Sequence, residues 1–350
     1  MEESVRKGSK SRWIYLLAAG SAMSMMARTT IAQEPYRVTD QWKVGGDTGW
    51  DYLAVDPKSK LLYVTHGNHV LVIDTGTGKV QSDITGLKGT HGVAFDTSGK
   101  FGYITDGGAN EVVVFDRKTN AIVDRVPAGT NPDGIVFEPV TQTVWAFNGR
   151  SKNVTVIDGS THKVVATVAL PGKPEFPVAD GKGSVYDNIE DLSQIVHIDA
   201  KSHTVLAAWP IAPCEGPSGL AIDREHARLF AVCDGKKMAV VDANSGKVVA
   251  TPAIGEGPDA AGFDAKYQLA FSSNGEGTLS VVHEDSPDSY KVLQTLSTKR
   301  GARTMTLDEA SGKIYVVTAD FGPRPAATPD NPRPRPSILP GSFVVMVISR

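Results

Sequence analysis

Cysteine is scarce in this sequence, with only Cys214 and Cys233 among 350 residues. Two cysteines are too few for a disulfide-stapled scaffold, so a hydrophobic core must hold the fold, and an apolar content of 41% can supply one. Charged residues amount to only 21%, whereas 35 glycines and 21 prolines punctuate the chain. This turn-rich composition excludes a helical bundle and favours a strand-rich globular protein.

Motifs that identify several enzyme classes are also missing. The chain has no glycine-rich phosphate loop between a strand and a helix, and no Gly-x-Ser-x-Gly element. It also lacks the Cys-x-x-Cys-His motif that attaches haem covalently. Local sequence therefore offers no support for a nucleotide-phosphate site, a nucleophilic hydrolase triad or a covalently bound haem.

A single long apolar run occurs, and it lies near the N-terminus. Basic side chains precede residues 13–27, and small residues follow this run up to Ala32. This order is typical of a secretory signal peptide, and the run is shorter than the roughly 20 residues of a membrane-spanning helix. We predict a signal peptide over residues 1–32, a mature chain over 33–350 in the periplasm or secreted, and no stable membrane span after cleavage.

The charge of the mature chain bears on its partners. Removal of the signal peptide takes away five basic and two acidic residues, which leaves a net charge of −6. Proteins that bind nucleic acid through its phosphates normally carry a positive excess. Nucleic acid is therefore disfavoured as a partner, and a small molecule or a periplasmic protein is expected instead.

The two cysteines could form a disulfide in an oxidising compartment. Cys233 is expected at the end of a strand, and Cys214 in the loop that leads into the neighbouring strand. A disulfide that closes a loop of about 20 residues would stabilise the fold by roughly 3 kcal/mol. Two buried free thiols are the main alternative, and thiolate-bound copper is a more remote one.

Short apolar runs that end in an acidic residue recur along the chain. In one set the final aspartates are 42, 42, 41 and 43 residues apart, and they are Asp74, Asp116, Asp158, Asp199 and Asp242. A second set, exemplified by residues 92–96, occurs seven times and is followed by a β-branched or aromatic run such as 61–65. A period in the low forties with several strands per unit predicts a β-propeller.

The strand pattern predicts an all-β fold of seven blades with four antiparallel strands each. Six units have a fourth strand, but the seventh ends at Arg350 after its third. Residues 36–44 have the pattern of a fourth strand without the other three. We predict that this N-terminal strand completes the last blade, closes the ring and removes two exposed sheet edges.

The residues also resemble a known repeat family. The run 62–66, Leu-Tyr-Val-Thr-His, resembles the tyrosine-valine-threonine-asparagine signature of the YVTN β-propeller repeat family, with 72–74 and 78–80 completing the repeat. His66 stands where the signature has asparagine. The mature chain looks like the YncE-type periplasmic propellers, in the superfamily of quinoprotein amine dehydrogenase-like propellers. The resemblance implies a seven-bladed fold and an association with single-stranded DNA, although propellers host many unrelated functions.

The two faces of the predicted ring differ. On one face the connections are repetitive aspartate and glycine turns, in which His162, His203 and His226 are expected to be solvated. On the other face, around the mouth of the central channel, each blade presents different side chains, so a binding site is expected there. The candidate ligand-binding residues are Trp50, Asp51, Asp133, Asn148, Arg150, Glu175, Asn188, Glu215, Asp259, Asn274, Arg303 and Asp320.

Three kinds of function are compatible with this face. Cations, aromatic rings and carboxylates are all expected on this face, and this mixture favours a small ligand that carries both charges. Cations and aromatic rings alone would suit single-stranded DNA, but the carboxylates disfavour it. The cations are Arg150, Lys299, Arg300 and Arg303, and the rings are Trp50, Tyr186 and Phe321. Alternatively, His66 and His91 with Asp51 or Asp133 would bind a divalent metal such as zinc or copper and support a hydrolase or an oxidoreductase. The sequence leaves catalysis open.

One segment departs from the repeat. Residues 321–341 carry seven prolines and are expected to form a stiff, extended loop inserted in the last blade. Because the loop leaves from the channel-mouth face, it could cover the mouth as a lid, reach a partner or remain a solvated surface loop.

Overall fold

The computed structural model describes residues 1–4, 8, 34–328 and 334–350. The chain divides into two units, residues 1–34 and Pro35–Arg350. The predicted signal peptide, 1–32, lies almost wholly outside the described residues. Among the residues that are described, no helix has the length and apolar character to cross a bilayer.

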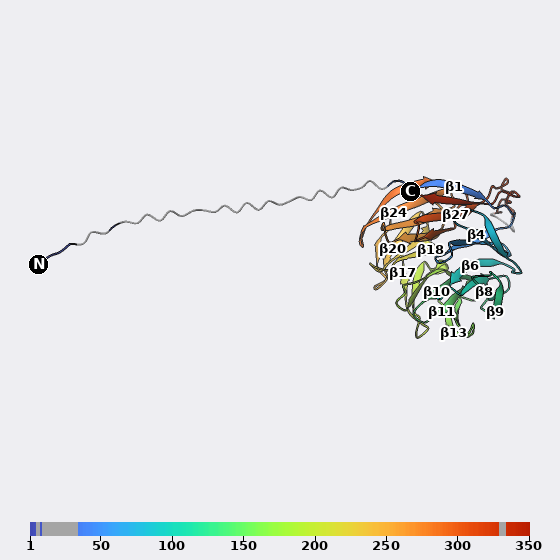
Figure 1. Cartoon of the computed structure of the whole chain (residues 1–350), viewed down its shortest axis with the longest axis horizontal. Coiled ribbons are helices and arrows are strands. Elements are labelled where there is room, and N and C mark those ends of the chain that lie inside the picture. The colour runs from blue at the N-terminus through green and yellow to red at the C-terminus, as the bar shows by residue number, and fades with distance from the viewer. Residues whose placement is uncertain (5–7, 9–33, 329–333) are drawn as a thin grey trace. The chain divides into compact units, whose positions relative to one another are not determined.

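Residues Pro35–Arg350 form seven four-stranded antiparallel sheets, which confirms the predicted all-β propeller (Figure 1). Blade 1 comprises β2 (Trp50–Asp56), β3 (Leu61–His66), β4 (His69–Asp74) and β5 (Val80–Ile84). Blade 2 comprises β6 (Thr90–Phe95), β7 (Phe101–Asp106), β8 (Glu111–Asp116) and β9 (Ile122–Pro127). Blade 3 comprises β10 (Pro132–Glu138), β11 (Thr143–Asn148), β12 (Asn153–Asp158) and β13 (Val164–Ala169).

The remaining blades follow the same plan. Blade 4 comprises β14 (Pro174–Ala179), β15 (Ser184–Ile189), β16 (Gln194–Asp199) and β17 (Thr204–Pro210), with the 3₁₀ turn η1 (Glu190–Leu192) after β15. Blade 5 comprises β18 (Glu215–Asp223), β19 (Arg228–Asp234), β20 (Lys237–Asp242) and β21 (Val248–Ala250). Blade 6 comprises β22 (Pro258–Asp264), β23 (Leu269–Asn274), β24 (Thr278–Ser286) and β25 (Ser289–Ser297). Blade 7 comprises β26 (Met305–Asp308), β27 (Lys313–Thr318), β28 (Val344–Ser349) and β1 (Arg37–Lys43).

The ring is closed by the N-terminal strand, as predicted. Strand β1 pairs antiparallel with β28, with Trp42 opposite Val345. In Figure 1 the blue strand β1 accordingly lies beside the red C-terminal strands. The first strands of neighbouring blades contact each other around the whole ring, and β2 contacts both β6 and β26. Seven first strands therefore surround the central channel.

Apolar packing between neighbouring blades forms the core. The described buried apolar residues group into seven clusters, and each cluster draws its members from two adjacent blades. Between blades 1 and 2, for example, Tyr63 packs with Ile104 and Phe115. Each such side chain contributes roughly 1.5–3 kcal/mol when fully buried. The blades are thus held together at their flanks, which leaves the channel ends available for polar residues.

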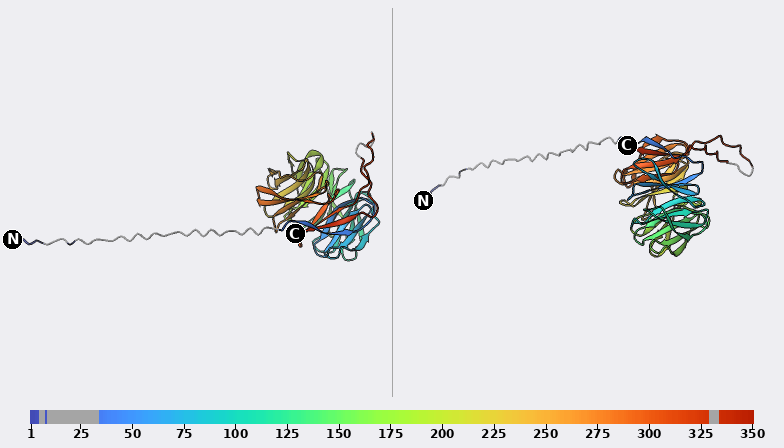
Figure 2. Two further views of the ribbon diagram at one scale, coloured as in Figure 1. Left: turned by 90° about the horizontal axis from the view of Figure 1, so that it is seen from above. Right: turned by 45° about the vertical axis from the view of Figure 1, so that its right-hand side comes forward.

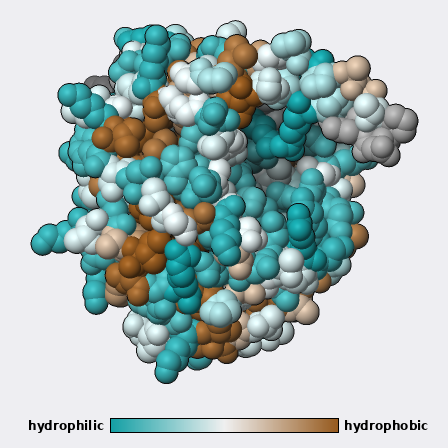
Figure 3. Space-filling model, turned by 90° about the vertical axis from the view of Figure 1, so that its right-hand side faces the viewer, coloured by the Kyte–Doolittle hydropathy of each residue, from teal (hydrophilic) through white to brown (hydrophobic). Residues whose placement is uncertain are grey.

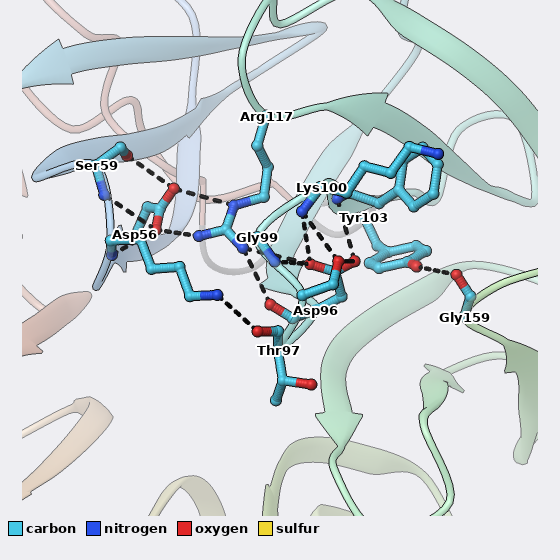
Figure 4. Close-up of polar contacts among 12 residues, drawn as sticks. Asp56, Ser59, Asp96, Thr97, Gly99, Lys100, Tyr103, Arg117 and Gly159 are labelled. Carbon is cyan, nitrogen blue, oxygen red and sulfur yellow. Dashed lines mark hydrogen bonds and ion pairs between the residues drawn. The ribbon is translucent and has the colours of Figure 1, made fainter.

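Buried charges reinforce one blade boundary on the turn face (Figure 4). Asp56 accepts a hydrogen bond from the main-chain N–H of Lys58 at 2.8 Å, and so caps the turn after β2. Arg117, from blade 2, is buried and donates from Nε to Asp56 at 3.0 Å and from Nη1 to the main-chain oxygen of Asp96 at 3.0 Å. Although burial opposes ionisation, the hydrogen bonds from Arg117 and Ser59 lower the pKa of Asp56.

The proline-rich segment is a long connection between β27 and β28. Its base is a short paired section, in which Phe321 bridges Ile338 and Gly322 N–H donates to the Ser337 oxygen at 2.9 Å. Figure 2 shows the described part of this loop projecting beyond the strands. The loop therefore leaves from a fixed base on the ring.

Candidate binding site at the channel mouth

One position of the repeat places a polar side chain at the channel mouth in every blade. Each first strand ends in or just before an acidic residue on the turn face. The residue five positions earlier lies in the opposite half of the strand or, in blade 7, two residues before it. These seven residues are Asp51, His91, Asp133, Glu175, Ser218, Asp259 and Arg303. All seven line one cavity of about 540 Å³. Figure 3 shows a hollow with mainly hydrophilic walls on the face that carries the proline-rich loop.

One aromatic residue of the next repeat position, Tyr52, lines the cavity, and its ring packs on Phe176. The next repeat position is Tyr52 in blade 1 and Phe176 in blade 4, and their ring centroids are 5.0 Å apart. Blade 3 has Gly134 at this position, where an added Cβ would lie 2.2 Å from the main-chain oxygen of Glu175. Burial and the nearby carboxylates raise the pKa of Tyr52 well above its ordinary value, so its hydroxyl remains protonated.

His91 links two carboxylates in the cavity wall. Its Nδ1 lies 2.6 Å from Oδ2 of Asp51 and 3.6 Å from Oδ1 of Asp133. Burial alone would lower the pKa of His91, but the hydrogen bond that His91 donates to Asp51 and the charge of Asp133 outweigh it and raise this pKa to about 9. Burial raises the pKa of Asp133 to about 6 despite the attraction of His91. One ligand atom from each of these three side chains lies within 4.8 Å of the others, a spacing at which they could hold a metal ion once His91 loses its proton.

Lys173 joins a second pair of carboxylates. Its Nζ forms ion pairs with both Glu175 and Glu190, and all three residues line the cavity. Burial raises the pKa of Glu175 to about 8, against the attraction of Lys173. On the other side of the mouth, Nε of Arg303 lies 3.3 Å from Oδ2 of Asp259, whose pKa burial raises to about 7.

These pKa values share one physical origin. Five carboxyl groups line the cavity, namely Asp51, Asp133, Glu175, Glu190 and Asp259. Among the described residues they form ion pairs with three cationic groups, those of His91, Lys173 and Arg303, and Arg335 also lines the cavity. Because buried carboxylates repel one another and lose solvation, part of the set is held protonated. A positively charged group that enters the cavity would therefore be favoured.

A cationic chamber adjoins the carboxylate cavity. Trp50, Arg303 and Arg335 line both the cavity and a neighbouring pocket of about 390 Å³. Arg300 and Arg324 also line this pocket, and Arg324, like Arg335, belongs to the proline-rich loop. The ring centroids of Trp50 and Phe321 are 6.1 Å apart in its wall. A further pocket of about 210 Å³ adds Lys299 and Asp320, which form an ion pair at 2.7 Å.

The structure brings half of the predicted ligand-binding residues into the cavity. These are Trp50, Asp51, Asp133, Glu175, Asp259 and Arg303. Asp320 lines only the smallest pocket, and Arg150 and Glu215 are exposed outside the cavity lining. Arg150 therefore does not join the other predicted cations, and the ring of Tyr186 is buried in the core between blades 4 and 5.

The three predicted asparagines are buried and bind protein groups. Nδ2 of Asn148 donates to Oγ1 of Thr155 at 3.0 Å, and Nδ2 of Asn274 donates to Oγ of Ser280 at 3.1 Å. Nδ2 of Asn188 donates to the main-chain oxygen of Ser218 at 2.8 Å. These residues lie at or near the ends of the second strands β11, β15 and β23, and they are fully buried outside the cavity lining. Their amides stabilise the mouth and do not line it.

The two histidines of the predicted metal pair lie in different surroundings. His66 is buried, with Nδ1 at 3.0 Å from both Oγ1 of Thr48 and Nε2 of His69, and its ring packs on Phe343. Burial and the neighbouring His69 lower the pKa of His66 to about 4. His91 instead contacts Asp51 and Asp133, so the metal-capable group at the mouth contains His91 without His66.

Cys214 and Cys233 form a disulfide, with their Cα atoms 5.6 Å apart. The bond joins the segment before β18 to the end of β19, close to Pro217, which pairs with Cys233. It thereby fixes the backbone that leads into the channel-lining residue Ser218.

Several lining residues escaped the sequence-based prediction, namely Tyr52, Lys173, Glu190, Ser218 and Arg335. Counting five residues back from the final acid of each first strand would have found Ser218. Tyr52 occupies the following repeat position, opposite Phe176. Lys173 lies two residues before Glu175, at a repeat position where five of the other blades have glycine, so its side chain departs from the repeat. Arg335 lies in the proline-rich insertion, which has no counterpart in the other blades.

Comparisons with known proteins support the fold. No family model matches the sequence, and no curated protein matches it significantly. The structure is similar to hydrazine synthase of Kuenenia stuttgartiensis, with a TM-score of 0.69 and 15% identity over 78% of this chain and 94% of that one. It is also similar to the structure of U3-55K, with a TM-score of 0.72 and 8% identity over 89% of this chain and 98% of that one. At these identities the similarity shows the propeller fold alone.

Proposed function

We propose that the protein binds a small ligand carrying both a positive and a negative group at the mouth of its channel. The observation that carries this proposal is the excess of buried carboxyl groups beside an arginine-lined chamber. The positive group would enter the cavity between Asp133, Glu175 and Asp259, where it would allow the carboxyl groups to ionise. The negative group would reach Arg300, Arg324 and Arg335.

The dimensions and walls of the two chambers suit such a ligand. Volumes of about 540 and 390 Å³ fall in the range of small-molecule pockets, roughly 300–1,000 Å³. Trp50 lies at the junction and offers a ring face to a cation, and Arg335 contributes a side chain from the proline-rich loop. The proposed setting is that of an exported YVTN-type propeller in the periplasm or outside the cell, with a periplasmic protein as the alternative partner.

Binding of three probes of equal chain length would test the proposal. 6-Aminohexanoate carries both charges, hexane-1,6-diamine is doubly positive, and hexanedioate is doubly negative. Titration calorimetry should give the tightest binding for 6-aminohexanoate. Asp133→Asn and Arg324→Gln should each weaken it by about tenfold or more, because one charged contact at each end is worth about 1.5–3 kcal/mol. Arg150→Ala is the matched control, since Arg150 is exposed and lies outside the cavity.

Two results would refute the proposal. One is that none of the probes binds at millimolar concentration. The other is that binding persists unchanged in both the Asp133→Asn and the Arg324→Gln variant while the Arg150→Ala variant behaves identically.

A second candidate is metal-dependent chemistry at the same mouth, favoured by the group Asp51, His91 and Asp133. One imidazole and two carboxylates are a donor set typical of zinc or manganese, and such an ion would polarise a substrate oxygen or activate water. In this case His91→Gln would abolish metal binding at the mouth, whereas His66→Gln would not.

A further inference from the structure

A second cluster of titratable groups lies on the turn face, at the boundary of blades 5 and 6. Asp223 ends β18, His226 lies in the turn that follows it, and Glu284 lies in β24. Nδ1 of His226 is 2.6 Å from Oδ2 of Asp223 and 3.1 Å from Oε1 of Glu284. The sequence-based expectation that His226 is merely solvated is therefore wrong, because its ring bridges two buried carboxyl groups.

The repeat makes this boundary unusual. At the boundary of blades 1 and 2, the residue after the last acid of a third strand is Arg117, which neutralises Asp56 at the end of β2. The equivalent residue of blade 6 is Glu284, and the carboxylate equivalent to Asp56 is Asp223. At the boundary of blades 5 and 6, the carboxyl group of Glu284 thus lies near that of Asp223, whereas the boundary of blades 1 and 2 has an ion pair at the equivalent positions. The remaining third strands that end in aspartate are followed by neutral residues at this position, namely Thr75, Gly159, Ala200 and Ala243, so the pair of acids is particular to blades 5 and 6.

Glu284 is both deeply buried and poorly partnered. Its side chain is 1% exposed and that of Asp223 is 2% exposed, whereas His226 is 27% exposed. Neither carboxylate oxygen of Glu284 accepts a hydrogen bond among the described residues. An unpartnered buried carboxylate is costly unless a cation or a proton neutralises it.

The nearby arginine does not fill this role. Nη1 of Arg228 lies 2.9 Å from Oδ2 of Asp242, Nη2 lies 3.2 Å from Oδ1 of Asp288, and Nε donates to the Pro287 oxygen. Burial, followed by the charge of Asp223, raises the pKa of Glu284 to about 7. His226 therefore supplies the basic group that contacts both carboxyl groups, while the ion pairs of Arg228 go to Asp242 and Asp288.

We propose that Asp223, His226 and Glu284 bind a divalent transition metal, with zinc or manganese as the expected class. One ligand atom from each residue lies within 4.8 Å of the others, and one imidazole nitrogen with two carboxylate oxygens is a donor set that these ions accept. The metal replaces the proton on His226 Nδ1, which is hydrogen-bonded to Asp223 and lies 3.1 Å from Oε1 of Glu284. Because the ligands come from two blades, the ion cross-links blades 5 and 6, and the partly exposed His226 gives it a route from solvent.

Metal titration of the full-length protein without a His-tag tests this site. After treatment with EDTA and dialysis, Zn²⁺ and Mn²⁺ are titrated separately into wild type and into Glu284→Gln, His226→Gln and His91→Gln. The His91→Gln variant disables the metal-capable group at the channel mouth and serves as the matched control. We expect one ion per chain in wild type and in His91→Gln. Affinity should fall by more than about 100-fold in the other two variants, since even second-shell partners are typically worth 10–100-fold.

Unfolding without metal separates loss of a ligand from loss of the fold. Glu284→Gln removes a buried unpaired charge, so its Tm in EDTA should equal or exceed that of wild type, whereas Zn²⁺ should raise the Tm of wild type only. The proposal is overturned if wild type binds no ion, if Glu284→Gln binds it with unchanged affinity, or if binding is lost in His91→Gln instead.

Discussion

At the scale of single residues, buried charged side chains distinguish individual blade boundaries from one another. Arg117 is surrounded by Asp56 and Asp96 with almost no solvent exposure. Loss of one partner leaves the other charges buried without compensation, which is far more costly than the loss of a surface pair.

Arg117→Ala should therefore lower the free energy of unfolding by about 3–5 kcal/mol. Urea unfolding followed by tryptophan fluorescence measures this change. Arg125→Ala is the control, because Arg125 pairs with Glu111 in a partly exposed position and its loss should cost about 0–1 kcal/mol. Equal effects of the two substitutions would contradict the assigned role of Arg117.

Glu175 makes stability depend on pH. Its pKa rises from the ordinary value of 4.5 to about 8 in the folded protein. Between these values the folded protein retains a proton that the unfolded chain has lost, so the contribution is full below about 4.5 and disappears as pH rises towards 8.

Glu175→Gln removes this contribution, so the stability of the variant relative to wild type should grow from pH 5 to pH 8, by about 1 kcal/mol or more. Urea unfolding at several pH values without ligand provides the measurement. The exposed Glu215→Gln variant should follow the wild-type curve at every pH. If the curves of Glu175→Gln and wild type stay parallel, Glu175 does not have the assigned raised pKa.

At the scale of elements, β1 is the strand on which ring closure depends. The half-buried ring of Trp42 packs 5.6 Å from the ring of Tyr315 and lies over Gly78, where an added Cβ would be 2.4 Å from the indole. Trp42→Ala should lower the free energy of unfolding by about 2 kcal/mol or more. Gln41→Ala, at the exposed adjacent position, should stay within about 0.5 kcal/mol of wild type in the same unfolding measurement. Similar values for both would show that β1 contributes little through Trp42.

The proline-rich loop supplies the element-scale test of the cationic chamber. Replacement of residues 323–336 by a short glycine-serine turn keeps the paired base at Phe321 and Ile338 but removes Arg324 and Arg335. Affinity for 6-aminohexanoate should drop by about tenfold or more. Tm should barely change, because no described residue of the removed segment belongs to one of the seven core clusters. Arg324→Gln combined with Arg335→Gln should reproduce the loss of affinity. Full affinity in the shortened protein would remove the loop from the proposed site.

Sequence patterns predicted the elements well and the site only partly, for identifiable reasons. The turn aspartates and the apolar runs recur because each blade has the same four strands and the same turns. The sequence period was therefore sufficient to predict the strands and the closure of the ring by β1. Asn148 and Asp133 could not be separated in this way, since both lie near strand ends at the mouth and only the strand register shows which one faces the channel. Glu284 and Asp223 come from different blades and both contact His226. No short sequence motif contains both residues, so a local pattern could not predict their proximity.

At the scale of the whole molecule, charge decides which large partners are compatible. The predicted mature chain carries a net charge of −6. Five carboxyl groups line the cavity at the channel mouth. We expect no binding of a 20-nucleotide oligo(dT) at 150 mM salt, as measured by fluorescence anisotropy. Saturable binding that weakens steeply with added salt would instead support the single-stranded DNA association that the YVTN-type resemblance implies.

Closure of the ring by β1 and β28 also sets the order in which the site can appear during synthesis. The cavity draws side chains from all seven blades, and the seventh blade requires strands from both ends of the chain. A growing chain can form early blades, but it cannot hold β1 in place until β28, the last strand, has emerged. The complete cavity therefore forms only after β28 has emerged and β1 has paired with it.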